Sequence, residues 1–203
     1  MGRVSDARER LMKAVMELIW TDSYGATTID QICEKAGVKK GSFYYFFDSK
    51  ADLAHEALDV EWKLYRPQLD ALFSATVPPL ERIRNHCDFN YKEQSSLKKK
   101  HGYVLGCPLC TLGAEISTQE SGLRKLVQEI MDQSRKYIET AIRDAHAAGL
   151  VEAPNAAAKA RIVYAYSEGL MTQARIQNDL SVLREMSAGI FEILGVNQAS
   201  TVA

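Results

Sequence analysis

The densest group of side chains able to do chemistry lies between residues 39 and 45. Lysine ammonium groups bind phosphate oxygens, and serine and tyrosine hydroxyls can contact phosphates or base edges. Solvated surface is the simpler explanation for lysines, but adjacent exposed aromatic rings on a small domain usually contact a partner. We therefore predict a nucleic-acid contact surface at this segment. Its members are Lys39, Lys40, Ser42, Tyr44 and Tyr45.

The cysteine pair at Cys107 and Cys110 is the main alternative site for chemistry. Structural zinc needs four ligands, and no second CxxC or HxxxH accompanies this one, so we predict no metal and no cofactor. A thioredoxin-like enzyme would need a βαβ context, which this helical region lacks. Two interpretations stay open for Cys107: a buried small side chain, or a reactive thiol that ionises easily near a helix N-terminus.

The four histidines do not form a catalytic set. His55, His86, His101 and His146 have no acid, base or nucleophile at a spacing that would partner them. We therefore predict that the chain is not an enzyme.

The lysine- and tyrosine-rich segment follows a short helix with clear boundaries. Thr28 and Gln31 form a capping box, and apolar residues then recur at helical spacing up to Ala36. Gly37 stands where the chain must turn, because a positive φ costs glycine little. Two short helices around such a turn predict a helix-turn-helix, whose second helix can enter the DNA major groove.

The neighbouring segments complete a small helical domain. A first helix is expected over 5–21, and a second cap at 49–52 begins a helix expected to end near Pro67. Phe43 and Phe47 are interpreted as core residues that hold the recognition helix in place.

Long helices with short breaks fill the remaining chain, so the predicted fold class is all-α. A helix should begin at Pro78 and Pro79, and the basic run 98–101 is expected to be a solvated loop. A hydrophobic residue after Gly149 indicates a helix stop. The other helices are expected over 106–118, 122–148, 155–176 and 180–194.

Composition limits the function classes. The 203 residues are 46% hydrophobic and 25% charged with a net charge of −1, which suits a globular protein and excludes a strongly basic nucleic-acid coat. No apolar stretch approaches the roughly 18 residues of a membrane span, and no secretory signal pattern begins the chain. The expected location is the cytoplasm, with the four cysteines as thiols and no membrane partner.

The last two helices predict a contact with a second copy of the chain. The helix over 155–176 carries small residues such as Ala165 and Gly169, which allow another helix to approach closely. The helix over 180–194 has one apolar stripe. Both helices would form a four-helix interface with their copies in a dimer. The alternative is that both helices only pack in the core of their own chain.

The first quarter of the chain resembles the DNA-binding domain of TetR-family transcriptional regulators. Phe46 stands where the family often has a second tyrosine, and Tyr45 offers a hydroxyl from an adjacent direction. The residues that carry the resemblance are Thr27, Thr28, Ile29, Ile32, Ala36, Gly37, Val38, Lys40, Gly41, Ser42, Phe43, Tyr44, Phe47, Ser49, Lys50 and Leu53.

The resemblance implies a homodimeric repressor, joined through its last two helices, that a small-molecule or electrophile effector releases from a near-palindromic DNA operator. It implies three parts: a three-helix DNA-binding domain at 1–48, a connecting helix at 49–67, and a larger ligand-binding and dimerisation domain at 68–203. The implied DNA contacts are Thr28, Lys39, Lys40, Gly41, Ser42, Tyr44, Tyr45 and Lys50.

The effector region follows from the same resemblance. A pocket for a small molecule would be mostly apolar with a few polar groups. The segment that begins Gly106-Cys107 resembles a subgroup in which some members respond to electrophiles or oxidants, so a thiol-based sensor acting through Cys107 is the alternative function. The effector-binding candidates are Trp62, His86, Phe89, Asn90, Cys107, Tyr137, Tyr166 and Gln173.

Overall fold

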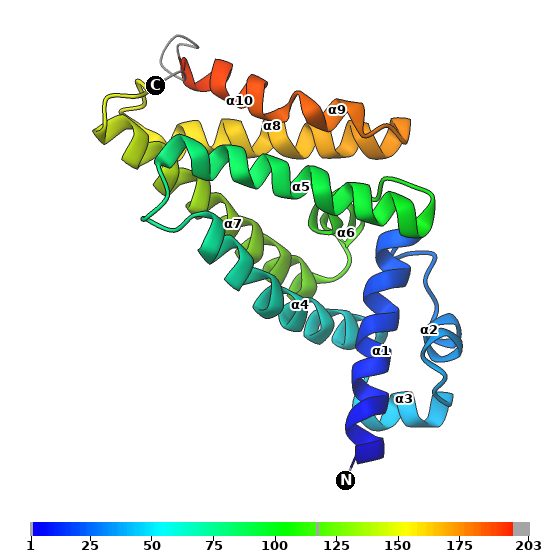
Figure 1. Cartoon of the computed structure of the whole chain (residues 1–203). Coiled ribbons are helices and arrows are strands. Elements are labelled where there is room, and N and C mark those ends of the chain that lie inside the picture. Colours follow the sequence, from blue (N-terminus) through cyan, green and yellow to red (C-terminus); the bar gives the residue numbers. More distant parts are fainter. Residues whose placement is uncertain (1, 117, 197–203) are drawn as a thin grey trace. The chain divides into compact units, whose positions relative to one another are not determined.

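The computed structural model describes residues 2–116 and 118–196. Its regular structure in these ranges is entirely helical, as predicted (Figure 1). The chain divides into two compact units, Met1–Tyr65 with Pro108–Ile130 and Arg66–Cys107 with Met131–Ala203. None of the described helices is both long and apolar enough to span a membrane.

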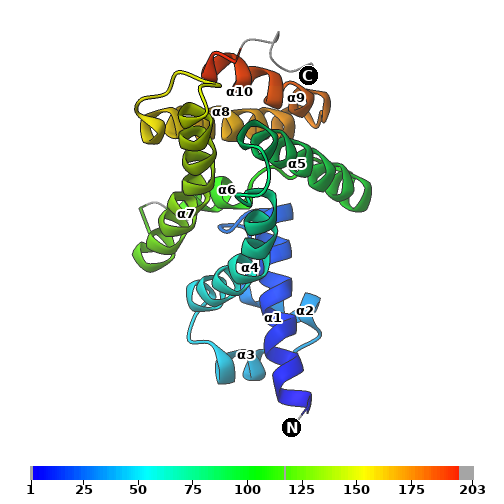
Figure 2. The same cartoon turned by 60° about the vertical axis from the view of Figure 1, so that its left-hand side comes forward.

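The first unit contains the predicted helix-turn-helix. Helices α1 (Gly2–Thr21), α2 (Ile29–Ala36) and α3 (Lys40–Phe46) precede α4 (Lys50–Leu72), and α2 and α3 lie beside α1 (Figure 1, Figure 2). We call residues 2–48 the head. Fully buried side chains from all four helices and from the turn after α3 form the core of this unit: Leu11, Val15, Ile32, Phe43, Phe47 and Leu53.

The ends of α2 are fixed by the residues that predicted them. The Thr28 hydroxyl accepts from the Gln31 amide at 3.2 Å, and the Gln31 side chain accepts from the Thr28 amide at 2.8 Å. Gly37 adopts φ 61°, and the next amide, that of Val38, donates to the Cys33 carbonyl at 2.9 Å. The Arg10 guanidinium donates to the Ala36 carbonyl at 2.8 Å, so α1 also closes this turn.

The expected end of a helix near Pro67 is wrong. Helix α4 continues through Pro67 to Leu72. Proline removes the bond to the Lys63 carbonyl, but Pro67 and Lys63 are both exposed, so water can hydrate the freed carbonyl. Leu69 and Phe73 beyond it are buried, and this burial favours continuing the helix over ending it.

Two further helices contribute to the first unit. Helix α6 (Pro108–Ile116) contacts α1, and α7 (Ser121–Ala147) begins in this unit and continues into the second. Gly149 at φ 72°, with the Leu150 amide donating to the Ala145 carbonyl at 2.9 Å, forms the predicted helix stop.

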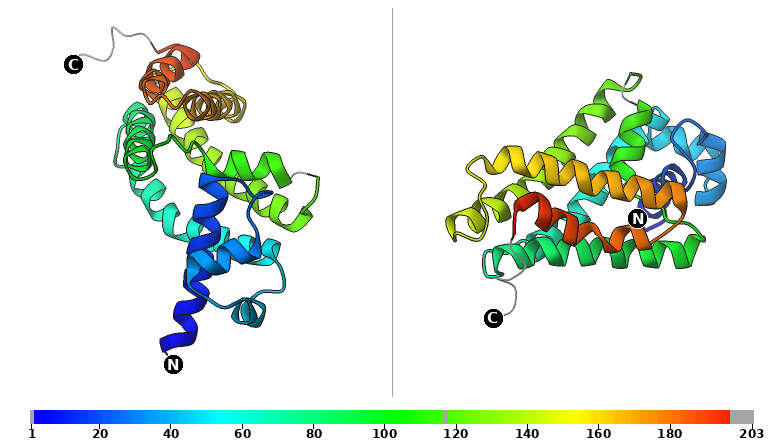
Figure 3. Two further views of the ribbon diagram at one scale, coloured as in Figure 1. Left: turned by 90° about the vertical axis from the view of Figure 1, so that its right-hand side faces the viewer. Right: turned by 90° about the horizontal axis from the view of Figure 1, so that it is seen from above.

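The second unit is a bundle of long helices. Its α8 (Ala156–Gln177) lies beside α10 (Met186–Leu194), and α9 (Ser181–Arg184) and α10 both contact α5 (Pro79–His101) (Figure 1, Figure 3). The single helix expected over 180–194 is divided into α9 and α10 at Glu185. The ψ angle of Glu185 is −10°, away from the usual α-helical value of about −42°.

The basic run 98–101 is helical, so the expected loop is wrong. These four residues form the last turn of α5, and Gly102 ends the helix with φ 83° and a 2.8 Å bond from its amide to the Lys98 carbonyl. Cations at a helix C-terminus are stabilised by the partial negative charge of the exposed carbonyls. The Lys98 ammonium also donates to the Asn178 carbonyl at 2.5 Å.

Candidate DNA-binding surface and effector region

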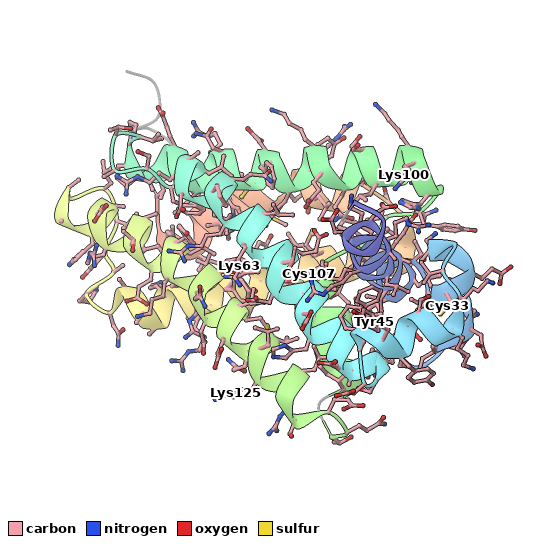
Figure 4. The ribbon with its side chains drawn as sticks, turned by 90° about the horizontal axis from the view of Figure 1, so that it is seen from below. Cys33, Tyr45, Lys63, Lys100, Cys107 and Lys125 are labelled. Atoms are coloured by element: carbon pink, nitrogen blue, oxygen red, sulfur yellow. The ribbon has the colours of Figure 1, made fainter. Side chains whose placement is uncertain are left out.

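Helix α3 buries one face and exposes another. Phe43 is fully buried, whereas the Tyr44 and Tyr45 side chains are 53% and 77% exposed. Lys39 and Gly41 are exposed at the start of the helix and Ser42 is half-buried. The structure therefore brings the predicted segment together as one open surface. Figure 4 labels Tyr45 on α3 and Cys33 on the neighbouring α2.

The Lys40 ammonium is paired within the head. It lies 2.8 Å from one Asp30 carboxylate oxygen and 3.0 Å from the other, and this hydrogen bond, followed by the charge of Asp30, raises the pKa of Lys40. Asp30 was not a sequence candidate. Its position in the first turn of α2 places a negative charge beside the predicted phosphate-binding surface, and Lys40 neutralises that charge.

Lys50 points into the protein. Its ammonium donates to the Tyr24 carbonyl at 2.6 Å and to the Thr27 carbonyl at 2.8 Å, and lies 4.1 Å from the Tyr24 ring centroid. Burial lowers the pKa of Lys50, while Glu120 and Glu115 oppose that shift. Two of its three N–H donors are therefore used inside the first unit.

Thr28 is exposed at the N-terminus of α2, where its hydroxyl takes part in the capping box. Tyr24, Glu115 and Glu120, like Asp30, were not sequence candidates. Their contacts join segments 90 or more positions apart, and no short spacing in the sequence indicates such pairs.

Three of the effector candidates gather around Phe73. The ring centroids of His86 and Tyr137 lie 5.3 and 5.5 Å from that of Phe73, and Asn90 Nδ2 lies 3.5 Å from His86 Nε2. The Tyr137 hydroxyl donates to Asp70. Burial, and then the bond to Asp70, raises the pKa of Tyr137.

The other candidates lie elsewhere. Trp62 belongs to the first unit, beside Tyr65, and Gln173 is exposed on α8. Phe89 is half-buried on α5. Tyr166 lines a cavity of about 470 Å³ between α8 and α10 with Glu185, Phe191 and Glu192, so the eight candidates do not form one site.

Two parts of the chain match known families. Residues 11–57 match the family described as bacterial regulatory proteins, tetR family, and residues 79–190 match the tetracyclin repressor-like C-terminal domain. The second match alone covers more than half of the chain. The protein belongs to the TetR family.

The relatives agree with this assignment. The chain is 27% identical to an HTH-type transcriptional regulator from the lacX 3′ region of Lactococcus lactis, over 88% of each chain. It is 23% identical to the repressor NemR of Escherichia coli K12, over 93% of this chain and 94% of NemR.

Solved structures share the fold of this TetR-family protein. A TetR-family regulator from Agrobacterium tumefaciens aligns with TM-score 0.85 at 19% identity, covering 95% of this chain and 99% of its own. The reduced form of E. coli NemR aligns with TM-score 0.78 at 20% identity, covering 95% and 99%. The family is one of DNA-binding transcriptional regulators and not of enzymes, and its members typically act as dimers with small-molecule effectors.

The cysteines of this TetR-family chain differ in exposure. Cys33 and Cys87 are buried, and burial raises the pKa of the Cys87 thiol to about 12. Cys107 directly precedes α6 and Cys110 lies in its first turn, and both are half-buried. The two thiols near the helix N-terminus are therefore the more accessible pair.

Burial of His86 predicts a loss of stability in acid. Burial lowers the pKa of His86 from 6.5 to about 4. Between pH 6.5 and pH 4 this histidine is therefore protonated in the unfolded chain but neutral in the folded chain. Stability is therefore lost as the pH falls from 6.5 towards 4. In His86→Gln this loss should be smaller by about 3 kcal/mol.

Urea unfolding of wild type and His86→Gln at pH 7 and pH 4 measures this difference. All other titrating groups cancel when the two proteins are compared. A difference in unfolding free energy that stays constant between the two pH values would show that His86 titrates normally in the folded protein.

Proposed function

We propose that this regulator is a homodimeric repressor that places α3 of each protomer in the major groove of a near-palindromic operator. The two heads would contact half-sites about 34–36 Å apart, one helical turn of DNA. The observation that carries this proposal is the exposure of Tyr44 and Tyr45 on a helix whose opposite face is anchored by buried Phe43. Its place of action would be the cytoplasm, where bacterial DNA lies.

The start of α3 supports contacts to phosphates and base edges. Lys39 stands at the N-cap of α3. Among the described residues outside this helix backbone, nothing lies within 4 Å of a Cβ added at Gly41, so the backbone could approach a groove. Ser42 and Tyr44 can contact base edges, with the Tyr44 ring against a thymine methyl. Lys40, Thr28 and Tyr45 would contact phosphates, and for Lys40 this means exchanging the Asp30 carboxylate for a phosphate oxygen.

Lys50 is proposed to act in two ways. Its bonds to Tyr24 and Thr27 hold the turn that leads into Thr28. A phosphate contact would require the ammonium to turn outward from these bonds.

A salt titration tests the assignment of Lys39. Lys39→Gln should weaken binding about tenfold and lower the slope of log K against log[salt] by about 1, since one phosphate contact is lost. The DNA is a duplex selected from a random-sequence library by the wild-type protein, and binding is followed by fluorescence anisotropy.

Lys125→Gln is the matched control, because the Lys125 side chain is 80% exposed on α7 and pairs with Glu129 four positions on (Figure 4). This variant should keep the wild-type slope. Equal slopes for wild type and Lys39→Gln would remove Lys39 from the interface. Failure of the wild-type protein to select any duplex would overturn the function itself.

The exposed face of α8 supports dimerisation through the last two helices. Ile162 is 53% and Ile176 is 78% exposed, and Ala165 and Gly169 lie between them at helical spacing. In the described part of the chain, apart from the backbone of α8 itself, nothing lies within 4 Å of a Cβ added at Gly169. An apolar stripe with small residues at its middle suits close approach of the same helix from a second copy.

Ile176→Glu should therefore convert the dimer to a monomer, because it would bury two carboxylates at the two-fold contact. Analytical ultracentrifugation measures the change, and operator affinity should fall at least tenfold. Leu64→Glu is the control, since Leu64 is 66% exposed on α4 in the first unit. A dimeric Ile176→Glu protein would contradict this interface.

Induction would follow from a small molecule that binds the second unit. An effector shifts the equilibrium only if it prefers the conformation that cannot hold both heads on DNA. Phe73, His86, Asn90 and Tyr137 pack against one another there, and an effector would have to separate them. Their aromatic rings and few polar groups would suit an uncharged or weakly polar ligand. Residues 68–203 would then form the ligand-binding and dimerisation domain, with 49–67 as the connection to the DNA-binding residues 1–48.

A thiol sensor at Cys107 is the second candidate function. Cys107 is half-buried directly before α6, and the similar NemR structure is described as a reduced form. A helix N-terminus stabilises a thiolate, which is the form that reacts with oxidants and electrophiles.

Hydrogen peroxide should then release wild-type protein from the selected duplex, and dithiothreitol should restore binding. Cys107→Ser should remain bound under peroxide, and the matched Cys110→Ser variant should respond like wild type. Release of Cys107→Ser by peroxide would exclude this residue as the sensor.

A further inference from the structure

Two carboxylates hold the turn between α1 and α2. The Gly25 amide donates to Glu115 Oε2 at 2.9 Å, and the Tyr24 hydroxyl donates to Glu120 Oε1 at 3.2 Å. Glu115 lies in the last turns of α6, and Glu120 directly precedes α7. All of these residues belong to the first unit, in which α6 also contacts α1.

Lys50 holds the same turn from another element. Its ammonium bonds to the Tyr24 and Thr27 carbonyls, and Thr27 is itself almost fully buried at 2% exposure. The Thr27 hydroxyl donates to the Ser23 carbonyl at 2.6 Å, which closes the turn on itself. The next residue, Thr28, is the N-cap of α2, so the turn sets where the helix-turn-helix starts.

The three charged groups compensate one another. The Lys50 ammonium lies against the Tyr24 ring, and the Tyr24 hydroxyl donates to the Glu120 carboxylate. Burial, and then the charge of Glu120, raises the pKa of Tyr24 to about 12, so the phenol remains a donor at any physiological pH. Removal of either carboxylate would leave less negative charge near the Lys50 ammonium. Without Glu115 the Gly25 amide would lose its acceptor, and without Glu120 the Tyr24 hydroxyl would lose its acceptor.

We propose that Glu115 and Glu120 are positioning residues through which α6 controls the conformation of the helix-turn-helix. A helix moves as a rigid body, so a displacement of α6 at its start, next to Cys107, would carry the Glu115 carboxylate away from Gly25. The start of α2 would then lose its restraint, and the head would lose its DNA-binding geometry. This inference rests on the proposed DNA-binding function. It means that DNA binding could be lost through a change of conformation within each head, as well as through a change in the distance between the two heads.

Amide hydrogen exchange without DNA tests the restraint directly. Glu115→Ala should speed exchange at least tenfold at the amides of residues 25–31 and leave the α3, α7 and α8 amides unchanged. Glu115→Gln should restore most of the protection, because the glutamine oxygen still accepts from Gly25. Glu129→Gln, an exposed carboxylate on α7 paired with Lys125, is the control and should match wild type.

Binding to the selected duplex tests the consequence. Glu115→Ala should bind about tenfold more weakly at a temperature where circular dichroism shows it fully folded. Tyr24→Phe and Glu120→Ala should weaken binding by similar factors, and the double variant by no more than either one, since they remove the same hydrogen bond.

Two results would overturn the proposal. One is wild-type exchange at residues 25–31 in both Glu115→Ala and Glu120→Ala. The other is faster exchange spread evenly over all helices, which would show that the carboxylates only stabilise the fold. If the wild-type protein selected no duplex, the proposed function would fail, whereas the exchange measurement would still report on the restraint.

Discussion

The burial of Phe43 is the constraint on which the DNA-binding surface depends. Helix α3 has seven residues, no side-chain cap bond and no acidic residue in its first turn, and so short a helix is not stable alone in water. Phe43 is fully buried and Phe47, just after the helix, is 1% exposed, with ring centroids 6.0 Å apart. Their burial stabilises the helix from one side and leaves the other side free to expose two tyrosines.

Long polar side chains close the turns of both units. Gln94 is fully buried on α5, and its amide oxygen accepts from the Leu105 and Gly106 amides at 3.1 and 2.9 Å. Its nitrogen donates to the Gly106 carbonyl at 3.1 Å, so one side chain satisfies three backbone groups of a non-helical segment. Arg82 holds the segment before α5 similarly, donating to the Ala75 and Val77 carbonyls at 3.2 and 2.7 Å and to Asp144 at 2.6 Å.

Such contacts are stabilising because a buried carbonyl or amide without a partner costs about 1–3 kcal/mol. They also fix the places where one helix leads into the next. Lys50 has the same role at the α1–α2 turn, where its ammonium donates to the Tyr24 and Thr27 carbonyls. A lysine predicted from the sequence to contact phosphate therefore also stabilises a turn inside the protein. The Gln94 bonds fix the backbone of the second unit up to Gly106.

The sequence by itself determined the all-α class, the helix-turn-helix and its family, because capping boxes, glycine turns and apolar spacing are local features that nearby residues enforce. Local rules failed at Pro67 and at the run 98–101, where burial of Leu69 and Phe73 and the charge preference of a helix end outweighed a proline and four basic residues. Only the tertiary structure decided which polar groups meet across long separations: Lys50 with Tyr24, Gly25 with Glu115, and His86 and Tyr137 around Phe73. These pairs depend on how helices pack, and packing is set by the sum of many weak contacts that no short stretch of sequence contains.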